Sequence, residues 1–128
     1  MRKQCHNPYM PLWEHVPDGE PHVFGDRLYV YGSHDLENGN EFCEQDYVCW
    51  SAPVTDLSDW RCDGVIYKKE QDPYNQDALP LYAPDVVKGP DGRYYLYYCI
   101  KFQDSFFYFK PRRANTGFMA ESIMRTAV

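Results

Sequence analysis

Two stretches of the chain place apolar runs on either side of turn residues, a pattern that predicts β-hairpins. In one of them, residues 81–87 and 94–98 are mostly aliphatic and aromatic, and Gly-Pro-Asp-Gly between them is a strong turn signal. Pro84 lacks a backbone donor, so the first strand is predicted to begin at or just after it. Asp85 is then a lone carboxylate at the start of an apolar strand, where it needs solvent, a partner or a ligand.

An earlier stretch follows the same plan. Glu20-Pro21 leads into an apolar run, a Gly/Asp turn and an arginine follow, and residues 28–33 form a Tyr-rich strand. The proline precedes Asp85 but follows Glu20, so the match is approximate. Asp85 lies 65 positions after Glu20, which indicates an internal repeat of about that period.

Two more strands are predicted between these hairpins. Residues 46–53 form one strand, residues 55–60 a polar turn, and residues 61–68 another strand that is bulged or bent at Gly64. Residues 20–68 therefore contain four short antiparallel strands in one sheet, and residues 69–80 connect it to the second hairpin.

The predicted fold class is all-β. A four-stranded sheet followed by a repeat of its opening is typical of a β-propeller, in which the innermost strand of each blade lines a central channel. Acids at the starts of two such strands would converge there from neighbouring blades. The alternative is a plain β-sandwich whose strand-end acids are solvated.

Composition narrows the classes of function. Aromatic residues make up 17% of the chain, which favours strands and surfaces that stack on flat or sugar-like ligands. The formal net charge of −6 is spread along the chain, which argues against a nucleic-acid partner. No apolar run is long enough for a membrane span, and the basic start lacks the apolar core of a secretory signal. We therefore expect a cytoplasmic protein without a membrane partner.

The five cysteines form an odd set without a C-x-x-C pair, which favours reduced, mostly structural thiols. A zinc site built from Cys43, Cys49, Cys62 and a histidine is an alternative, although the spacing resembles no usual ligand knuckle. We expect neither a metal nor a cofactor.

Two further places carry candidate side chains. Residues 1–19 are too rich in proline for a helix and form an extended lead-in, within which Trp13 either plugs a gap under the first strands or lies at the rim of a binding site. His34 and Asp35 follow the first Tyr-rich strand. They could be ligands at a strand end, but a solvated loop pair is the favoured interpretation.

Three motifs resemble glycoside hydrolase family 43, the five-bladed propeller glycosidases that act on arabinose-, xylose- or galactose-containing glycans. They are Asn7-Pro8 leading to Glu20-Pro21, the run Ser-Ala-Pro-Val-Thr-Asp-Leu-Ser-Asp-Trp over residues 51–60 with a glycine after it, and Tyr-Ala-Pro-Asp-Val over residues 82–86. The resemblance covers roughly residues 7–99. It implies about one and a half blades, with the first over about residues 20–68 and the start of the second over about 83–99.

The resemblance also implies roles for individual residues. The family uses a general base in the first blade, a second acid that tunes its partners in the second blade, and a glutamic acid that donates the proton in the third. Asp85 falls at the second-blade position and Glu20 at the base position, where the family usually has aspartate before proline; Asp18 is the fallback. Trp13, His22 and Tyr82 are the candidate substrate-binding residues.

The chain departs from the family in its extent. The third-blade proton donor has no candidate, and residues 102–128 form an atypical, partly basic tail without a blade pattern, which suggests a truncated or frame-shifted reading of a longer gene. We therefore expect the chain to descend from an inverting glycosidase that acts on an oligosaccharide or polysaccharide. We expect this polypeptide by itself to be inactive. The alternatives are a non-catalytic carbohydrate-binding fragment and a small all-β interaction domain.

Overall fold

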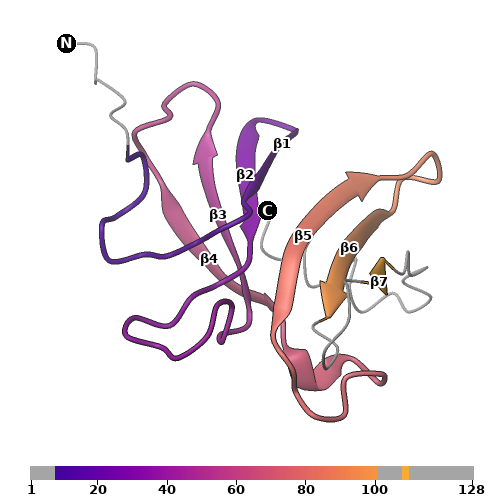
Figure 1. Cartoon of the computed structure of the whole chain (residues 1–128). Coiled ribbons are helices and arrows are strands. Elements are labelled where there is room, and N and C mark those ends of the chain that lie inside the picture. The colour runs from indigo at the N-terminus through magenta and orange to yellow at the C-terminus, as the bar shows by residue number, and fades with distance from the viewer. Residues whose placement is uncertain (1–7, 101–107, 110–128) are drawn as a thin grey trace.

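The structure, a computed structural model, describes residues 8–100 and 108–109, and these form two antiparallel sheets (Figure 1). The first sheet has the order β1-β2-β3-β4, with β1 at Glu20–Phe24, β2 at Arg27–Gly32, β3 at Tyr47–Pro53 and β4 at Arg61–Tyr67. The second has the order β5-β6-β7, with β5 at Leu81–Lys88, β6 at Tyr94–Ile100 and β7 at Tyr108–Phe109. A short 3-10 helix, η1 at Lys69–Gln71, lies in the connection between them. The predicted all-β class and four-stranded antiparallel sheet are confirmed.

The predicted irregularity in the fourth strand is present. Cys49 pairs with Gly64 while the next residue of β3, Trp50, pairs with Cys62, so Asp63 is the extra residue of a β-bulge. Gly64 has a φ of 95°, a conformation that only glycine adopts without strain. The bulge turns Asp63 from an ordinary ladder position into one whose side chain is almost fully buried.

The predicted start of β5 is wrong. The strand begins at Leu81, and Pro84 lies inside it. Tyr82 pairs with Cys99 and Asp85 with Tyr97, so Ala83 and Pro84 together oppose one residue of β6. Proline, which has no N–H to donate, is tolerated because β5 is an edge strand and Pro84 lies in this bulge, outside the ladder pairing.

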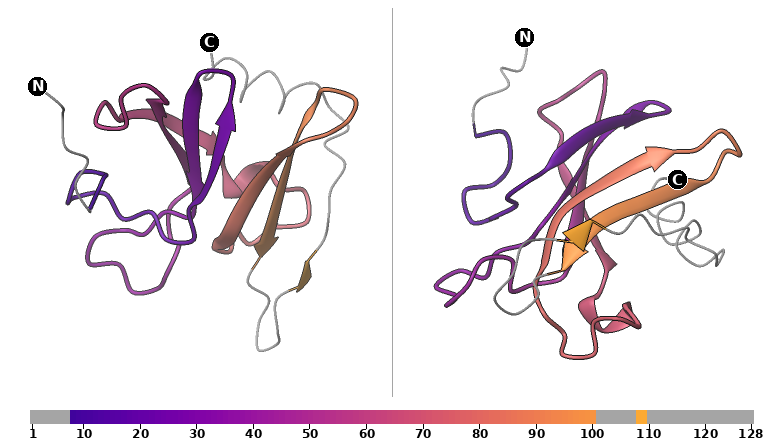
Figure 2. Two further views of the ribbon diagram at one scale, coloured as in Figure 1. Left: turned by 90° about the horizontal axis from the view of Figure 1, so that it is seen from above. Right: turned by 45° about the vertical axis from the view of Figure 1, so that its right-hand side comes forward.

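The hydrophobic core lies between the two sheets, which face each other in the views of Figure 2. Half of its buried residues are tyrosines, and they come from both sheets. The hydroxyls of Tyr67 on β4 and Tyr98 on β6 lie 3.1 Å apart across it, and Tyr98 also donates to the buried Asp72. Buried tyrosine hydroxyls need partners, and here they find one another and a carboxylate. The core residues are Tyr29, Tyr31, Tyr47, Cys49, Ile66, Tyr67, Leu81, Val86, Leu96 and Tyr98.

The lead-in packs against the first sheet at a glycine. A Cβ atom on Gly32 would lie 2.0 Å from Val16 Cγ1, so only glycine permits this approach to β2. A backbone hydrogen bond from Asp35 N–H to the His15 carbonyl, 3.0 Å long, ties the lead-in to the loop after β2.

Cys43, Cys49, Cys62 and Cys99 are free thiols. Burial raises the pKa of the Cys43 thiol to about 11, so it stays protonated at neutral pH. Across residues 8–100 and 108–109 no three His, Cys, Asp or Glu side chains are grouped as metal ligands, so the zinc alternative finds no ligand set there. The same ranges contain no helix long and apolar enough to cross a membrane.

The predicted tail falls mostly outside the described residues. Within it, Tyr108 and Phe109 of β7 pair with Ile100 and Cys99 at the end of β6. A two-residue strand therefore lies in a segment whose sequence carries no blade pattern.

Leu81 is fully buried at the start of β5, whereas Val87 on the same strand is 43% exposed. We expect Leu81→Ala to lower the free energy of unfolding by about 2–5 kcal/mol, because it leaves a cavity between the sheets. Val87→Ala is the matched control and should cost well under about 1 kcal/mol. Denaturant unfolding followed by tryptophan fluorescence measures both; equal losses would contradict the placement of the core.

Candidate functional site

Asp85 and His22 come from different sheets and meet at the edge between them. His22 Nε2 on β1 lies 2.5 Å from Asp85 Oδ1 on β5. Their side chains are 30% and 49% exposed, so the pair is accessible to solvent. The structure thus joins the predicted second-blade carboxylate to one of the predicted substrate-binding residues.

The position of Asp85 depends on the bulge just before it. Ala83 adopts a φ of 45°, and its N–H donates to the Ser33 hydroxyl at 2.9 Å. The Tyr47 hydroxyl donates to the Tyr82 carbonyl at 2.8 Å. These two bonds, from Ser33 just after β2 and Tyr47 on β3, hold the backbone of β5 at its bulge and so direct Asp85 toward β1.

The His22 ring is fixed by aromatic neighbours. Its centroid lies 5.7 Å from that of Phe24, with the ring planes 6° apart, and 6.4 Å from that of Tyr31. Phe24 makes an edge contact with Tyr94 of β6 at 4.8 Å. His22 and Phe24 are two residues apart on β1, so their side chains point to the same face of the strand. The contact of Phe24 with Tyr94 shows that this face turns toward the second sheet.

Glu20 begins β1 opposite Tyr31 and is exposed. Strand alternation places it on the same face as His22, two residues further on. Asp18, the fallback for the base, is exposed two residues before the strand, with a φ of 56°. Both candidate carboxylates therefore lie near the start of β1. Of the two, only Glu20 lies within the strand, on the face that carries His22.

The other two predicted substrate-binding residues, Trp13 and Tyr82, have different surroundings from His22. Trp13 is 67% exposed, which is not the environment of a buried plug, and its ring centroid lies 6.0 Å from that of Trp50. Trp50 is buried outside the core between the sheets, so no contact among the described residues brings Trp13 to Asp85. Tyr82 is half-buried, and its carbonyl accepts the bond from Tyr47 described above.

A second polar group was missed at the sequence level. The Glu14 side chain is only 5% exposed; its Oε1 lies 2.7 Å from His34 Nε2, and its Oε2 accepts a bond from the Trp50 indole at 3.2 Å. His34 is thus not half of a solvated loop pair. Asp35 is not either, since its carboxylate accepts the Cys43 N–H at 2.7 Å. Nothing in the Pro-rich lead-in distinguishes Glu14 from an exposed acid, because its partners come from other segments.

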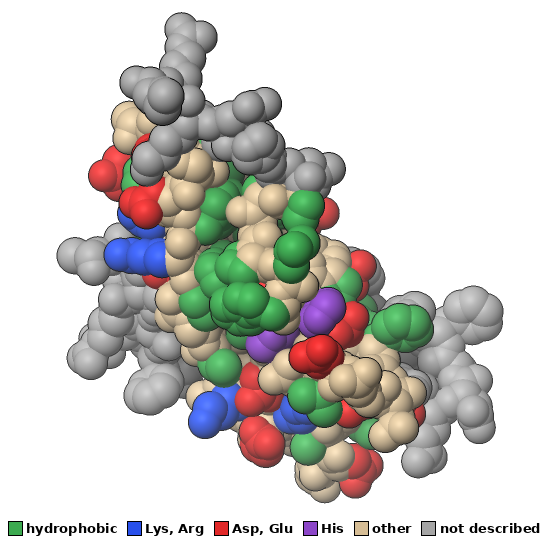
Figure 3. All heavy atoms as spheres, turned by 90° about the vertical axis from the view of Figure 1, so that its left-hand side faces the viewer, with side chains coloured by type: hydrophobic (Ala, Val, Ile, Leu, Met, Phe, Trp, Pro, Cys, Tyr) green, Lys and Arg blue, Asp and Glu red, His purple; other side chains and the backbone are tan. Residues whose placement is uncertain are grey.

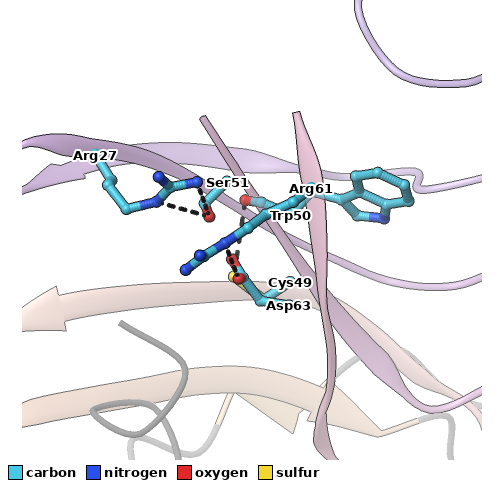
Figure 4. Close-up of polar contacts among 6 residues, drawn as sticks. All are labelled: Arg27, Cys49, Trp50, Ser51, Arg61 and Asp63. Carbon is cyan, nitrogen blue, oxygen red and sulfur yellow. Dashed lines mark hydrogen bonds and ion pairs between the residues drawn. The ribbon is translucent and has the colours of Figure 1, made fainter. Parts of the chain in front are cut away.

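Figure 4 shows a third polar group, formed by side chains of β2, β3 and β4. Arg27 donates to the Ser51 hydroxyl at 3.1 and 3.0 Å, and Arg61 Nε to Asp63 Oδ1 at 2.8 Å. Asp63 Oδ2 is buried and has no partner among the described residues. The pKa of Tyr29 is raised, mainly by burial and to a smaller extent by the negative charge of Asp63.

The surface also groups apolar side chains. Figure 3 shows hydrophobic side chains gathered in the middle of one face, with histidines beside them and acidic side chains around them. Tyr9, half exposed, adds an aromatic contact with Trp60 at 5.1 Å between centroids.

No protein-family model matches the sequence. Among curated proteins, a xylosidase/arabinosidase of Thermoclostridium stercorarium is 65% identical over 101 residues, covering 78% of this chain and 21% of that protein. A xylosidase/arabinosidase of Bacteroides ovatus is 32% identical over 106 residues, covering 77% of this chain and 32% of that protein. This chain is a relative of the glycoside hydrolase family 43 xylosidases/arabinosidases.

Solved structures agree with this relationship. A family 43 β-xylosidase/α-arabinofuranosidase from a compost microbial metagenome, crystallised with xylotriose, superposes with a TM-score of 0.61 at 25% identity, over 87% of this chain and 38% of that one. The RS223 β-xylosidase superposes with a TM-score of 0.59 at 28% identity, over 75% of this chain and 31% of that one. The chain spans between a fifth and two fifths of the length of these family 43 relatives.

We expect Glu14→Gln to destabilise this family 43 relative, because the change removes the charge that pairs with His34 while keeping the shape of the side chain. The expected loss is about 1–3 kcal/mol in the free energy of unfolding. Glu37→Gln, in the exposed loop after His34, is the matched control and should change it by less than about 0.5 kcal/mol. Thermal or urea unfolding measures both, and a neutral Glu14→Gln would show that the buried pair does not anchor the lead-in.

Proposed function

We propose that this chain supplies two active-site carboxylates of a family 43 glycosidase that hydrolyses xylose- or arabinose-containing oligosaccharides with inversion. The observation that carries the proposal is the meeting of Asp85 with His22 across the edge between the two sheets. The names of the xylosidase/arabinosidase relatives, and the xylotriose bound to one family 43 enzyme, support this class of substrate.

In this proposal each sheet is a propeller blade. The first blade spans about residues 20–68 and the second begins at the strand that carries Asp85, both within a unit of about residues 1–101. The inner strands would be β1 and β5, the two edge strands that lie against each other. Five blades of about 65 residues each would close the ring.

The chemistry follows from the separation of roles among carboxylates. Glu20 would act as the general base that activates water, since inverting glycosidases place base and acid about 6.5–9.5 Å apart so that a water fits between base and sugar. Asp85 would hold a negative charge near the proton donor and raise the donor's proton affinity. The half-buried Tyr82, which lies on the same strand as Asp85, would offer an aromatic face to a sugar ring.

The proposal can be tested in a chimera, because the relative from Thermoclostridium stercorarium is 65% identical over the shared segment. That segment of the relative is replaced by the matching segment of this chain, and hydrolysis of aryl xylosides and arabinosides is measured. Asp85→Asn should lower kcat/KM by at least about 100-fold, since it removes the charge that tunes the donor. Asp59→Asn, an exposed turn carboxylate, is the control. A chimera that folds and turns over normally with Asp85→Asn would disprove the proposal.

The identity of the base is a separate prediction. Glu20→Gln should abolish turnover in the same chimera while leaving its fold intact, because an amide cannot take a proton from water. Asp18→Asn should leave most of the activity. The reverse result would assign the base to Asp18, and two active variants would remove both from the mechanism.

A further inference from the structure

We infer that His22 is a positioning residue that fixes the orientation of the Asp85 carboxylate, rather than a residue that binds the sugar. This inference rests on the proposed function and deepens it. It begins from the contact between His22 Nε2 and Asp85 Oδ1.

The hydrogen bonds of Asp85 divide unequally between its two oxygens. Oδ1 accepts from His22 Nε2 at 2.5 Å and from the Val86 N–H at 2.7 Å. Among the described residues, no hydrogen bond reaches Oδ2. An ionised carboxylate only accepts hydrogen bonds, so Nε2 carries the proton in this contact. One oxygen is therefore held by the protein and the other is left for a reaction partner.

The His22 ring is held so that its Nε2–H cannot easily turn away. Phe24 stacks on it with planes 6° apart, and Tyr31, only 1% exposed, lies on another side. His22 is also the less exposed of the two partners, at 30% against 49% for Asp85. Nε2 is engaged by Asp85 and so is not free for a sugar hydroxyl, and the carboxylate is the more open group of the pair.

The remaining contacts cannot replace this one. The bonds from Ser33 and Tyr47 hold backbone atoms of residues 82 and 83, and they leave the side-chain torsions of Asp85 unrestrained. The Val86 N–H is the only other described donor to the carboxylate. Removing the His22 donor would let the carboxylate rotate while β5 stays in place, which reduces the fraction of molecules with a productive geometry.

Two substitutions separate the donor from the ring. His22→Phe keeps an aromatic ring to stack on Phe24 but removes the donor. His22→Gln removes the ring but carries an amide N–H near the place of Nε2. Both are made in the chimera described above, beside Asp85→Asn, and kcat and KM are measured for each after circular dichroism has confirmed folding. If the Phe variant does not fold, His22→Leu takes its place.

We expect His22→Phe to lower kcat by roughly 10- to 100-fold with KM within about twofold, as for the loss of a hydrogen bond to a charged group. His22→Gln should restore most of kcat. A rise in KM at unchanged kcat would overturn the inference and return His22 to the sugar-binding residues, and equal losses in the Phe and Gln variants would overturn it in favour of packing. A fully active Asp85→Asn variant would disprove the proposed function itself. If Asp85→Asn is inactive but the His22 variants keep the kcat and KM of the parent chimera, only the positioning role is disproved.

Discussion

The arrangement of the molecule depends on how the bulged edge of β5 is held against the first sheet. A bulge leaves backbone groups outside the ladder, and such groups must find partners when they are removed from water. Here the Ser33 hydroxyl, just after β2, accepts the N–H of Ala83 in the bulge, and the Tyr47 hydroxyl at the start of β3 donates to the carbonyl of the adjacent Tyr82. The position of the second sheet relative to the first is therefore set by specific polar contacts as well as by apolar packing.

This constraint explains why one carboxylate lies where it does. With Ala83 and Pro84 held in the bulge, Asp85 faces β1 at the edge between the sheets, half exposed and next to His22. Half of the buried core residues are tyrosines. Burial raises the pKa of Tyr31 and Tyr47 far above the ordinary value, so both stay neutral and act as packing groups whose hydroxyls can still bond.

Two other acids lie in different surroundings and have different consequences. Glu14 is buried but satisfied by His34 and the Trp50 indole, and so it ties the lead-in to the first sheet. Asp63 is buried with one oxygen unpartnered among the described residues, beside Arg61. Burial without full pairing is costly, so Asp63 lowers the stability of the sheet at the bulge beside Gly64.

The sequence by itself determined the hairpins, the antiparallel order of the first sheet, the bulge at Gly64 and the resemblance to family 43, because alternation, turn residues and short motifs are local signals. It also singled out Asp85, because a carboxylate in an apolar strand is locally anomalous. Only the tertiary structure decided that β5 begins before Pro84, since the tolerance for proline comes from an edge and a bulge. It alone paired His22 with Asp85 and His34 with Glu14, because those partners are separated by 63 and 20 positions in the sequence and are joined only when the sheets and the lead-in pack.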